Sequence, residues 1–507
     1  MKKWKTLNKL EVNPSADGEK LKVDEVIKIL LENRGLKTKK EVEEFLYPKF
    51  EDVTIGSVGI DKKQLQKAIG RIQKAINKKE KIVVFGDYDV DGICGTAILW
   101  ETLHSLGADV MPYIPHRIEE GYGLSILGIE KIKNHPSADG SKIKDVKLII
   151  TVDNGIVANK AVAFAKKEGI DVIITDHHVP SNPTTGLRLR GRSTVSSDRI
   201  GSDSRSSGLP KAFAIVHTTK LCGAGVAYLL SQEIKNHPSA DGSKIKNYEG
   251  RHLEFVALAT VADLVSLVGA NRTLVKFGIE QLRQTKRIGL LELFKEAGLD
   301  KSTIGVYEVG HIIAPRLNAM GRLEYAMDSL RLLCTRDRKR AAILAQVLGN
   351  TNRERQELTI ATVEHAKNNI KSQIANVKST SVNLKSLLFI AHETYQQGVI
   401  GLVAGKLVEE FYRPAIVVSV GEKYSKASAR SVSGFNIIEF IRMASELLVD
   451  AGGHPMAAGF TVETAKLTLL QKVLEDKADA LLDEEKLTRT LRIDCELPLS
   501  VIDSNLY

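Results

Sequence analysis

The 507-residue chain has few cysteines, few aromatic residues and no long hydrophobic run. Its four cysteines lie far apart without a Cys-x-x-Cys pair, which argues against a disulfide framework and a zinc site and fits a reducing compartment. No apolar run approaches the roughly 20 residues that span a bilayer. No apolar segment follows the N-terminal lysines, so the sequence shows no secretory signal. These absences predict a cytoplasmic protein.

The chain carries more positive than negative charge. It carries 72 Lys and Arg against 62 Asp and Glu, a net charge of +10, which favours a polyanionic partner. Aromatic residues make up only 5%, which leaves few platforms on which nucleic-acid bases could stack. At roughly 150 residues per domain, the length allows two to four domains.

The first half of the chain alternates between helix-like and strand-like segments. Apolar residues recur at helical spacing in 62–79, and the short β-branched run KIVVFG follows directly. This alternation predicts βαβ units and a parallel sheet. The later segments of this half are helices at 93–106, 124–133 and 158–168 and strands at 110–114, 146–152 and 171–175, with mostly helical sequence over 252–333.

A second α/β pattern follows a long, highly charged helical segment. Its predicted strands are 387–391, 414–420 and 457–462, and its predicted helices are 399–411, 436–449 and 464–482. The predicted fold class is therefore α/β, with a parallel-sheet domain joined by a long helix to a smaller α/β domain. The predicted divisions are an N-terminal extension (1–60), the first domain (61–335), the connecting helix (336–371), the second domain (380–485) and a C-terminal segment (486–507).

Three segments interrupt these patterns. KNHPSADGSKIK occurs identically at 133–144 and 235–246, and its Pro, Asp-Gly and lysines are typical of turns. The segment 181–210 is rich in serine and arginine and too polar to pack in a core. All three are predicted to be loop insertions. The two repeated copies are expected to have no catalytic role, and a nucleic-acid contact through its arginines is left open for 181–210.

Three of the strand-like runs end in acidic or histidine clusters: DYDVDG at 87–92, VDNG at 152–155 and DHH at 176–178. Ligands of open α/β sheets bind beyond the carboxyl ends of the strands, so these clusters are expected to converge. Converging carboxylates repel one another without cations. Their oxygen and nitrogen donors suit Mn²⁺ or Mg²⁺.

Other interpretations of these residues fit the sequence less well. A calcium loop needs Glu at its twelfth position, where this chain has Ile98. A helix N-cap explains one residue, such as Asp91, but not three aspartates in alternation. Asp263 comes late in the apolar run VALATVADLVSL, where a carboxylate is costly unless it is paired or metal-bound; a helix end that reaches solvent is the alternative.

In this order, DYDVDG, VDNG, DHH and the Asp of ATVADLV resemble the motifs of the DHH phosphoesterase superfamily. GGHPMAAGF at 452–460 resembles the signature of its associated C-terminal domain. IPHRIEEGYGL at 114–124, VADLVSLVGANR and APRLNAMGRL at 314–323 are similar to RecJ, a family of single-stranded-DNA-specific 5′→3′ exonucleases.

The resemblance implies a set of catalytic metal ligands and a two-metal mechanism. Two Mn²⁺ or Mg²⁺ ions about 3.5–4 Å apart would activate a water for attack on a backbone phosphorus. Asp176 is implied to orient an imidazole. The implied catalytic and metal-binding residues are Asp89, Asp91, Asp153, His177, His178 and Asp263, with Asp87 as a further metal ligand.

The resemblance also implies phosphate-binding residues and partners. The substrate-binding candidates are Arg117, Arg322 with Arg316 nearby, Ser428, Arg430, Gly453 and His454. The expected reaction releases 5′-mononucleotides from single-stranded DNA during repair and recombination. The implied partners are single-stranded DNA, a RecQ-type helicase and a single-strand-binding protein, with no membrane and a monomeric chain.

Two departures from the family keep alternatives open. Tyr395-Gln396-Gln397 stands where members commonly carry Trp-His, and the chain ends within what resembles the first strand of an OB-fold. The alternatives are a phosphodiesterase for short oligonucleotides or dinucleotides, and a catalytically inactive DNA-binding scaffold. Inactive relatives lose motif aspartates, whereas all of the motif positions are filled here.

Overall fold

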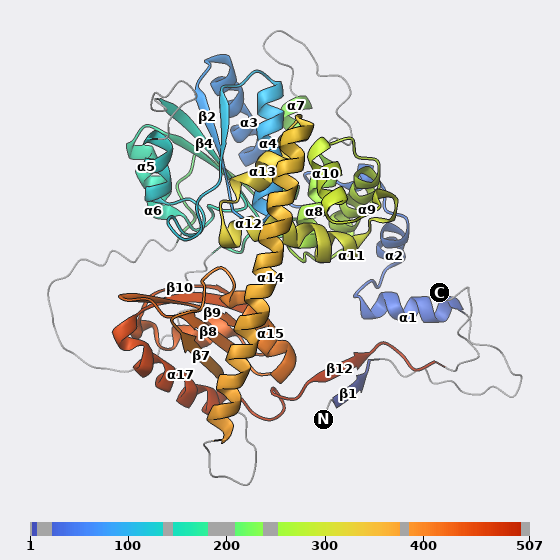
Figure 1. Cartoon of the computed structure of the whole chain (residues 1–507). Coiled ribbons are helices and arrows are strands. Elements are labelled where there is room, and N and C mark those ends of the chain that lie inside the picture. Colours follow the sequence, from blue (N-terminus) through green and yellow to red (C-terminus); the bar gives the residue numbers. More distant parts are fainter. Residues whose placement is uncertain are drawn as a thin grey trace, which may run out of the picture. The chain divides into compact units, whose positions relative to one another are not determined.

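Contacts divide the chain into two units. The larger unit is Tyr47–Asn352, and the smaller unit joins Met1–Leu46 to Arg353–Tyr507. The predicted loop insertions fall largely outside the described residues, and the predicted domain boundaries stay predictions. The computed structural model describes residues 3–7, 23–134, 145–180, 208–236, 252–375 and 385–497 (Figure 1).

The larger unit contains the predicted parallel sheet. Its five strands are all parallel and lie in the order β3-β2-β4-β5-β6. The α/β class is confirmed, and β6 is a strand that the sequence pattern did not predict. The strands are β2 (Lys81–Gly86), β3 (Val110–Tyr113), β4 (Val146–Val152), β5 (Asp171–Asp176) and β6 (Ala214–His217).

Helices cover both faces of this sheet (Figure 1). Ile82 and Val84 of β2 join the core beneath α3, α4 and α7, while Val83 and Phe85 join the core beneath α5 and α6. A strand buried on both faces needs an apolar side chain at every position, which explains the continuous apolar run of β2. The covering helices are α3 (Lys62–Asn77), α4 (Val90–Ser105), α5 (Ile126–Asn134), α6 (Asn159–Lys167) and α7 (Gly223–Asn236).

The rest of the larger unit is helical, as the sequence between 252 and 333 predicts. α8 packs against both α4 and α9, so this helical part extends the core beneath α4. Its helices are α8 (Leu253–Ala262), α9 (Gly269–Arg283), α10 (Ile288–Glu296), α11 (Val306–Glu308), α12 (Ala314–Leu323) and α13 (Met327–Cys334), with single turns at Phe50–Asp52, Lys301–Thr303 and Val309–Ile313.

The long helix α14 (Arg338–Ala375) begins in the larger unit and ends in the smaller one. Its bounds lie close to the predicted 336–371. Among the described residues, no helix combines the length and the apolar character needed to cross a membrane.

The smaller unit has a mixed sheet in the order β10-β11-β9-β8-β7. Only β7 and β8 pair in parallel; the other neighbours are antiparallel. Near the chain ends, β1 (Lys3–Thr6) pairs in parallel with β12 (Thr490–Ile493). The other elements are α1 (Val23–Asn33), α2 (Lys39–Leu46), β7 (Leu388–His392), α15 (Ile400–Phe411), β8 (Ala415–Ser419), β9 (Tyr424–Arg430), α16 (Ile437–Arg442), β10 (Leu448–His454), β11 (Ala457–Glu463) and α17 (Leu467–Leu481), with single turns at Ser445–Leu447 and Thr464–Lys466.

Two strands of this sheet differ from the sequence expectation. β9 has the sequence YSKASAR, which lacks β-branched residues, and its buried positions hold only Ser and Ala. β10 begins at Leu448, where the pattern predicted the end of a helix over 436–449; the helix there is only Ile437–Arg442. Both strands are formed by pairing with β11, which the propensity of each segment does not report: β10 forms a tight hairpin with β11, whereas residues 431–456 separate β9 from it.

Candidate metal centre

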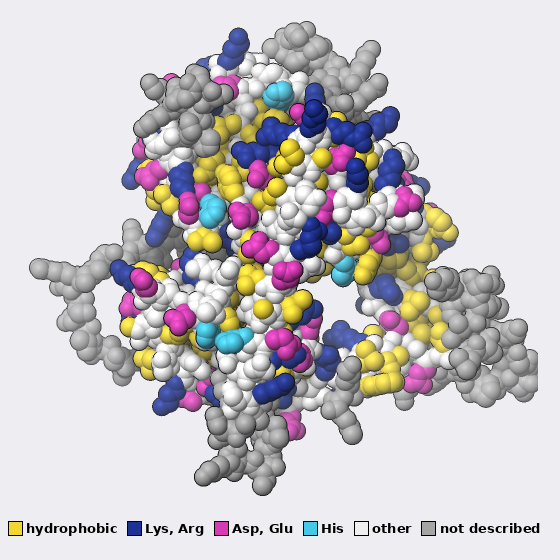
Figure 2. All heavy atoms as spheres, viewed as in Figure 1, with side chains coloured by type: hydrophobic (Ala, Val, Ile, Leu, Met, Phe, Trp, Pro, Cys, Tyr) yellow, Lys and Arg dark blue, Asp and Glu magenta, His cyan; other side chains and the backbone are white. Residues whose placement is uncertain are grey.

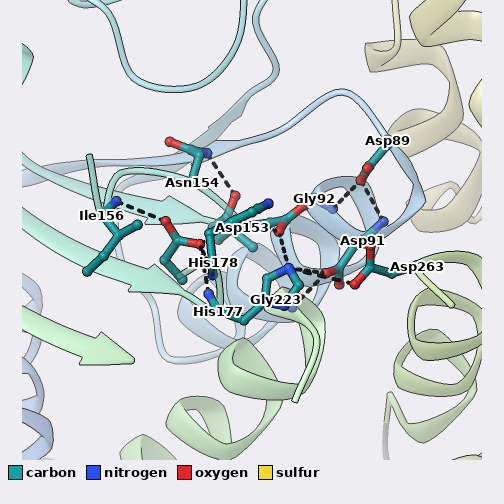
Figure 3. A network of polar contacts seen from close by, with 12 residues as sticks. Asp89, Asp91, Gly92, Asp153, Asn154, Ile156, His177, His178, Gly223 and Asp263 are labelled. Carbon is teal, nitrogen blue, oxygen red and sulfur yellow. Dashed lines mark hydrogen bonds and ion pairs between the residues drawn. The ribbon is translucent and has the colours of Figure 1, made fainter. Parts of the chain in front are cut away.

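The acidic motifs meet at the switch point of the parallel sheet. From β2 the chain crosses to β3 on one side, and from β3 it returns past β2 to β4 on the other side. Asp87 directly follows β2, and Asp153 directly follows β4. A crevice outside the strand ends at such a reversal is the usual ligand site of an open α/β sheet. Figure 3 shows the polar network that occupies it.

The first motif forms the beginning of α4. Asp89 is the N-cap residue, because its Oδ1 accepts hydrogen bonds from the amides of Asp91 and Gly92 at 2.9 and 3.1 Å. The sequence alternative of an Asp91 cap is therefore wrong: the helix begins at Val90, three residues earlier than predicted, and Asp91 lies in its first turn. The carboxylate of Asp91 therefore does not cap α4 and interacts with groups outside this helix.

Asp91 is fixed by the beginning of α7. Its two carboxylate oxygens accept hydrogen bonds from the amides of Gly223 and Ala224, both at 2.6 Å. A Cβ at Gly223 would lie 2.6 Å from the Cβ of Asp153, so only glycine allows α7 to approach this closely. The two amides orient a carboxylate that is only 1% exposed.

The second motif holds Asp153 in a left-handed backbone conformation with φ of 62°. Such a conformation costs free energy for a non-glycine residue and marks a functional constraint. The side chain of Asn154 stabilises it by donating to the carbonyl of Val152 at 2.8 Å and accepting from the amide of Leu124 at 3.1 Å.

The third motif brings two imidazoles to the same place (Figure 3). Asp176 Oδ1 lies 2.8 Å from His178 Nδ1, and because a carboxylate only accepts, we assign the ring proton to Nδ1. Asp176 Oδ2 accepts from the amide of Ile156 at 2.9 Å. His177 Nε2 lies 3.0 Å from Asp153 Oδ1. Asp176 thus sits in the position of the expected imidazole-orienting residue.

Asp263 approaches the same cluster from α8. It is the C-cap residue of that helix, and its Oδ2 lies 3.7 Å from His177 Nε2. His177 Nε2 is also 3.6 Å from Asp91 Oδ2. The alternative was that Asp263 ends the helix and simply reaches solvent. Its side chain is 30% exposed, but it also faces His177, so that alternative describes only part of its surroundings.

The cluster contains more negative charge than the protein itself neutralises. Burial, followed by the charge of Asp89, raises the pKa of Asp87 well above its usual range. Burial likewise raises the pKa values of Asp91 and Asp153, and burial with the charge of Asp91 raises the pKa of Asp263 to about 8. Burial lowers the pKa of His177, which favours the neutral ring that a metal requires. Carboxylates in such an environment call for a cation.

The donor atoms fit divalent metal ions. Three groups of side chains each place one donor atom per residue within 4.8 Å of the others, and Asp153 and His177 each belong to two of these groups. Asp87 Oδ1 is buried and has no hydrogen-bond partner among the described residues. The groups are Asp87, Asp89 and Asp153; Asp153, His177 and His178; and Asp91, His177 and Asp263.

Comparison with known proteins agrees with this geometry. The family model "DHH family, N-terminal domain" matches residues 81–260, and the model "DHHA1 domain" matches residues 380–480. The single-stranded-DNA-specific exonuclease RecJ of Haemophilus influenzae is 30% identical, over 85% of this chain and 72% of that protein. The chain belongs to the RecJ family. The RecJ of Bacillus subtilis is 34% identical over 94% of this chain.

Solved structures of RecJ proteins show the same fold. The Thermus thermophilus RecJ crystallised with Mn²⁺ has a TM-score of 0.69 at 28% identity, covering 93% of this chain and 61% of that one. A manganese-bound exonuclease RecJ has a TM-score of 0.63 at 30% identity, covering 83% of this chain and 95% of that one. This chain spans about half the length of the curated relatives from B. subtilis and T. thermophilus, at 55% and 53%.

Two residues of this RecJ-family site were not singled out from the sequence. The hydroxyl of Tyr122 donates to the carbonyl of Asp153 at 3.1 Å and lies 3.3 Å from His178 Nε2. Asn318 of α12 accepts from the amide of Val90 at 3.0 Å and so holds the turn that carries Asp89. Both lie within the motifs that carry the resemblance to RecJ, which was the available signal.

The predicted substrate-binding arginines of the larger unit lie in different surroundings. The guanidinium of Arg117 lies over the ring of Tyr88, 4.8 Å from its centroid, and the charge of Arg322 also acts on Tyr88. Arg316 instead pairs with Glu296 at 2.8 Å and donates to the carbonyl of Ile312. Arg117 and Arg322 therefore lie beside the first motif, whereas Arg316 has a partner within the helical part.

The predicted substrate-binding residues of the smaller unit lie on β9 and β10, the two strands that flank β11. Arg430 Nη1 donates to Ser428 Oγ at 3.2 Å, and Ala457 pairs with both Arg430 and His454. The φ of Gly453 is 145°, a conformation that glycine adopts readily. The structure thus brings these four residues to one end of the sheet.

The departure from the family pattern concerns a core residue. Tyr395, at the position where the resemblance implies Trp, is 3% exposed, and its hydroxyl lies 2.9 Å from His365 Nδ1. Its ring packs in the core of the smaller unit, so the substitution is accommodated by packing and one hydrogen bond.

Proposed function

We propose that this chain is a metal-dependent exonuclease that degrades single-stranded DNA from the 5′ end and releases 5′-mononucleotides. The observation that carries the proposal is the convergence of five carboxylates and two imidazoles at the switch point of a RecJ-family sheet. Relatives with this architecture are named single-stranded-DNA-specific exonucleases, and two RecJ structures hold manganese.

The residues that would hold two Mn²⁺ or Mg²⁺ ions are those whose donor atoms already lie together. Asp153 and His177 each belong to two of the groups, so both would help to hold the ions; His177 is shared with the group that contains Asp91 and Asp263. When bound, the ions supply Lewis acidity that activates a water and offsets charge on the leaving oxygen. The proposed metal and catalytic residues are Asp87, Asp89, Asp91, Asp153, His177, His178 and Asp263.

The protein's own contribution is orientation. The amides of Gly223 and Ala224 hold Asp91, and Asp176 fixes the ring of His178 through Nδ1. The hydroxyl of Tyr122 restrains the strained backbone of Asp153. Such partners keep donor atoms in place before any substrate arrives.

Each unit presents its own groups for DNA phosphates. In the larger unit Arg117 and Arg322 lie beside the metal motif, and in the smaller unit the Arg430 guanidinium lies beside the Ser428 hydroxyl. Guanidinium groups bind phosphate oxygens in a planar, bidentate manner. Phosphate contacts position a strand without reading its sequence, which suits a nuclease without base preference. His454 and Gly453 would add backbone contacts at the same end of the smaller sheet.

The wider assignment follows from the same proposal. Residues 61–335 would form the catalytic domain, 336–371 the connecting helix and 380–485 the substrate-binding domain, with 1–60 and 486–507 as flanking segments. We propose a cytoplasmic monomer in DNA repair and recombination, acting with a RecQ-type helicase and a single-strand-binding protein.

The decisive experiment follows the fate of end-labelled single strands with either the 5′ or the 3′ end blocked, in Mn²⁺ and in Mg²⁺. We expect mononucleotides from strands with a free 5′ end, and no products after chelation. Preferential digestion from a free 3′ end would refute the polarity. Hydrolysis that persists in excess chelator, with metal content measured as nil, would refute the metal mechanism. Di- and trinucleotides as the preferred substrates would favour the small-substrate phosphodiesterase.

A further inference from the structure

A second polar cavity lies in the larger unit, apart from the metal centre. Its volume is about 540 Å³, within the range of about 300–1,000 Å³ that is usual for small-molecule sites. It is lined by the turn between α9 and α10, the turn between α13 and α14, and the side chains of Glu101 and Glu254. Glu101 lies ten residues beyond Asp91 on α4, or about 15 Å along the helix axis at 1.5 Å per residue.

One wall of the cavity is a cluster of one cation and two carboxylates, in which one acceptor has no partner in the described part of the chain. Arg287 binds both oxygens of Glu101 at 2.7 and 2.9 Å, and its Nε donates to Glu254 Oε1 at 2.5 Å. Glu254 is only 6% exposed, and its Oε2 has no hydrogen-bond partner among the described residues. A buried acceptor without a donor is costly, so this oxygen is a place where a ligand donor gains free energy.

The two turns place unpaired cations at the same cavity. Lys286 and Arg336 are exposed, and neither forms an ion pair with a described residue. The turns are built alike, because the hydroxyls of Thr285 and Thr335 each accept the amide hydrogen two residues ahead at 3.2 Å. Figure 2 shows Lys and Arg side chains gathered around the upper end of α14, over α13 and α10.

We propose that this cavity binds a nucleotide. Lys286 and Arg336 would hold the phosphate, and an amino group of the base would donate to Glu254 Oε2, with the amides of Gln281 and Gln284 available to other base edges. An inorganic anion satisfies the cations but leaves Glu254 Oε2 unpaired, and a simple amine does the reverse. A nucleotide carries both groups. The proposal concerns a site distinct from the metal centre and does not depend on the proposed hydrolysis.

The test is a calorimetric titration of the full chain with deoxyadenosine 5′-monophosphate, in chelator so that the metal centre does not retain phosphate. We expect saturable binding that weakens roughly tenfold or more in the double variant Lys286→Gln/Arg336→Gln, because each charged hydrogen bond contributes strongly to phosphate affinity. The matched control is Lys339→Gln, which removes an exposed cation of α14 that does not line the cavity and should leave the affinity unchanged.

A second titration tests the contribution of the amino group on the base. Purine 2′-deoxyriboside 5′-monophosphate lacks the exocyclic amino group, so it should bind roughly tenfold more weakly than deoxyadenosine 5′-monophosphate, because Glu254 Oε2 then stays unpaired. Equal affinity of the two ligands would remove Glu254 from the proposed site and overturn the proposal. Since no hydrolysis is measured, the result is independent of the exonuclease assay.

Free nucleotides and nucleotide units of a DNA strand share this chemistry, so a (dA)₁₀ oligonucleotide is titrated in parallel. Weakening of deoxyadenosine 5′-monophosphate binding by the double variant supports the free nucleotide as the ligand. Weakening for the oligonucleotide alone, with Lys339→Gln unaffected, supports a unit within the strand. No saturable binding of either ligand, or equal affinities for the wild type and the double variant, overturns the proposal.

Discussion

Two buried polar clusters lie at opposite ends of the same two helices, and they differ in how charge is balanced. α4 carries Asp91 in its first turn and Glu101 near its end, and α8 carries Glu254 near its beginning and is followed by Asp263. At the far end Arg287 pairs with both glutamates, so the protein itself supplies a cation there. At the metal centre the described residues provide no Lys or Arg ion pair to the aspartates.

The difference appears in the pKa values. Burial raises the pKa of Asp263 to about 8, whereas burial of Glu101 is outweighed by the hydrogen bonds from His252 and Arg287, which lower its pKa to about 2. In a cluster that includes its own cation, loss of that cation destabilises the folded chain. A cluster without one is unfavourable until an external cation binds, and this is what a metal site requires.

The largest effect is expected from Asp153→Asn, which removes charge from the residue shared by two donor groups. We expect turnover to fall by more than about 100-fold, the upper loss expected from residues that only support ligands. The metal-free variant should be at least as stable as the wild type, because a buried like-charge repulsion is relieved. Steady-state rates on a labelled single strand and urea unfolding measure both. A destabilised apoprotein with intact turnover would show that the charge belongs to a structural cluster.

Arg287→Met should have the opposite signature. Arg287 is the only Lys or Arg among the described residues that pairs with Glu101 and Glu254. Its removal leaves the buried Glu254 and the part-buried Glu101 without a cation, and we expect a loss of about 3–5 kcal/mol in the free energy of unfolding. The matched control is Lys286→Met, a neighbouring exposed residue that should change stability by no more than ~0.5 kcal/mol. Equal unfolding midpoints for the two variants would contradict the comparison.

Asp176→Asn is expected to weaken the metal centre without removing a proposed metal ligand. Its carboxylate orients the ring of His178 and accepts hydrogen bonds from the backbone amides of Ile156 and His177. The side chain of asparagine would lose part of this network. Activity or metal affinity should fall by about 10–100-fold. Raised metal concentration should restore part of the rate; a defect that no metal concentration relieves would assign Asp176 a different role.

The stability of the metal-free protein is also expected to depend on pH. The pKa of Asp263 is raised in the folded state, so the folded chain binds the extra proton and loses stability as pH rises from about 4 to about 8. The pKa of Glu101 is lowered, so its contribution is lost as pH falls from about 4.5 towards about 2. Urea unfolding in chelator across this range should show both slopes. Adding Mn²⁺ should abolish the first and leave the second.

Much of the catalytic architecture was predictable because it depends on local pattern. The apolar run before Asp87 predicted a strand buried on both faces, and alternation with helices predicted a parallel sheet whose carboxyl ends meet at one edge. Both were confirmed. The motifs identified the family, and the structure brings together the predicted aspartates and histidines.

Other features were decided by tertiary structure alone. The start of α4 depended on an Asp89 cap supported by Asn318, a residue 228 positions away from Val90. β9 and β10 lack strong strand propensity and exist because β11 pairs with both. Composition could not show that Arg316 pairs with Glu296 or that Arg287 joins Glu101 to Glu254. Periodicity and motifs report which residues share a face or an edge, but a partner distant in sequence is fixed only when the chain packs.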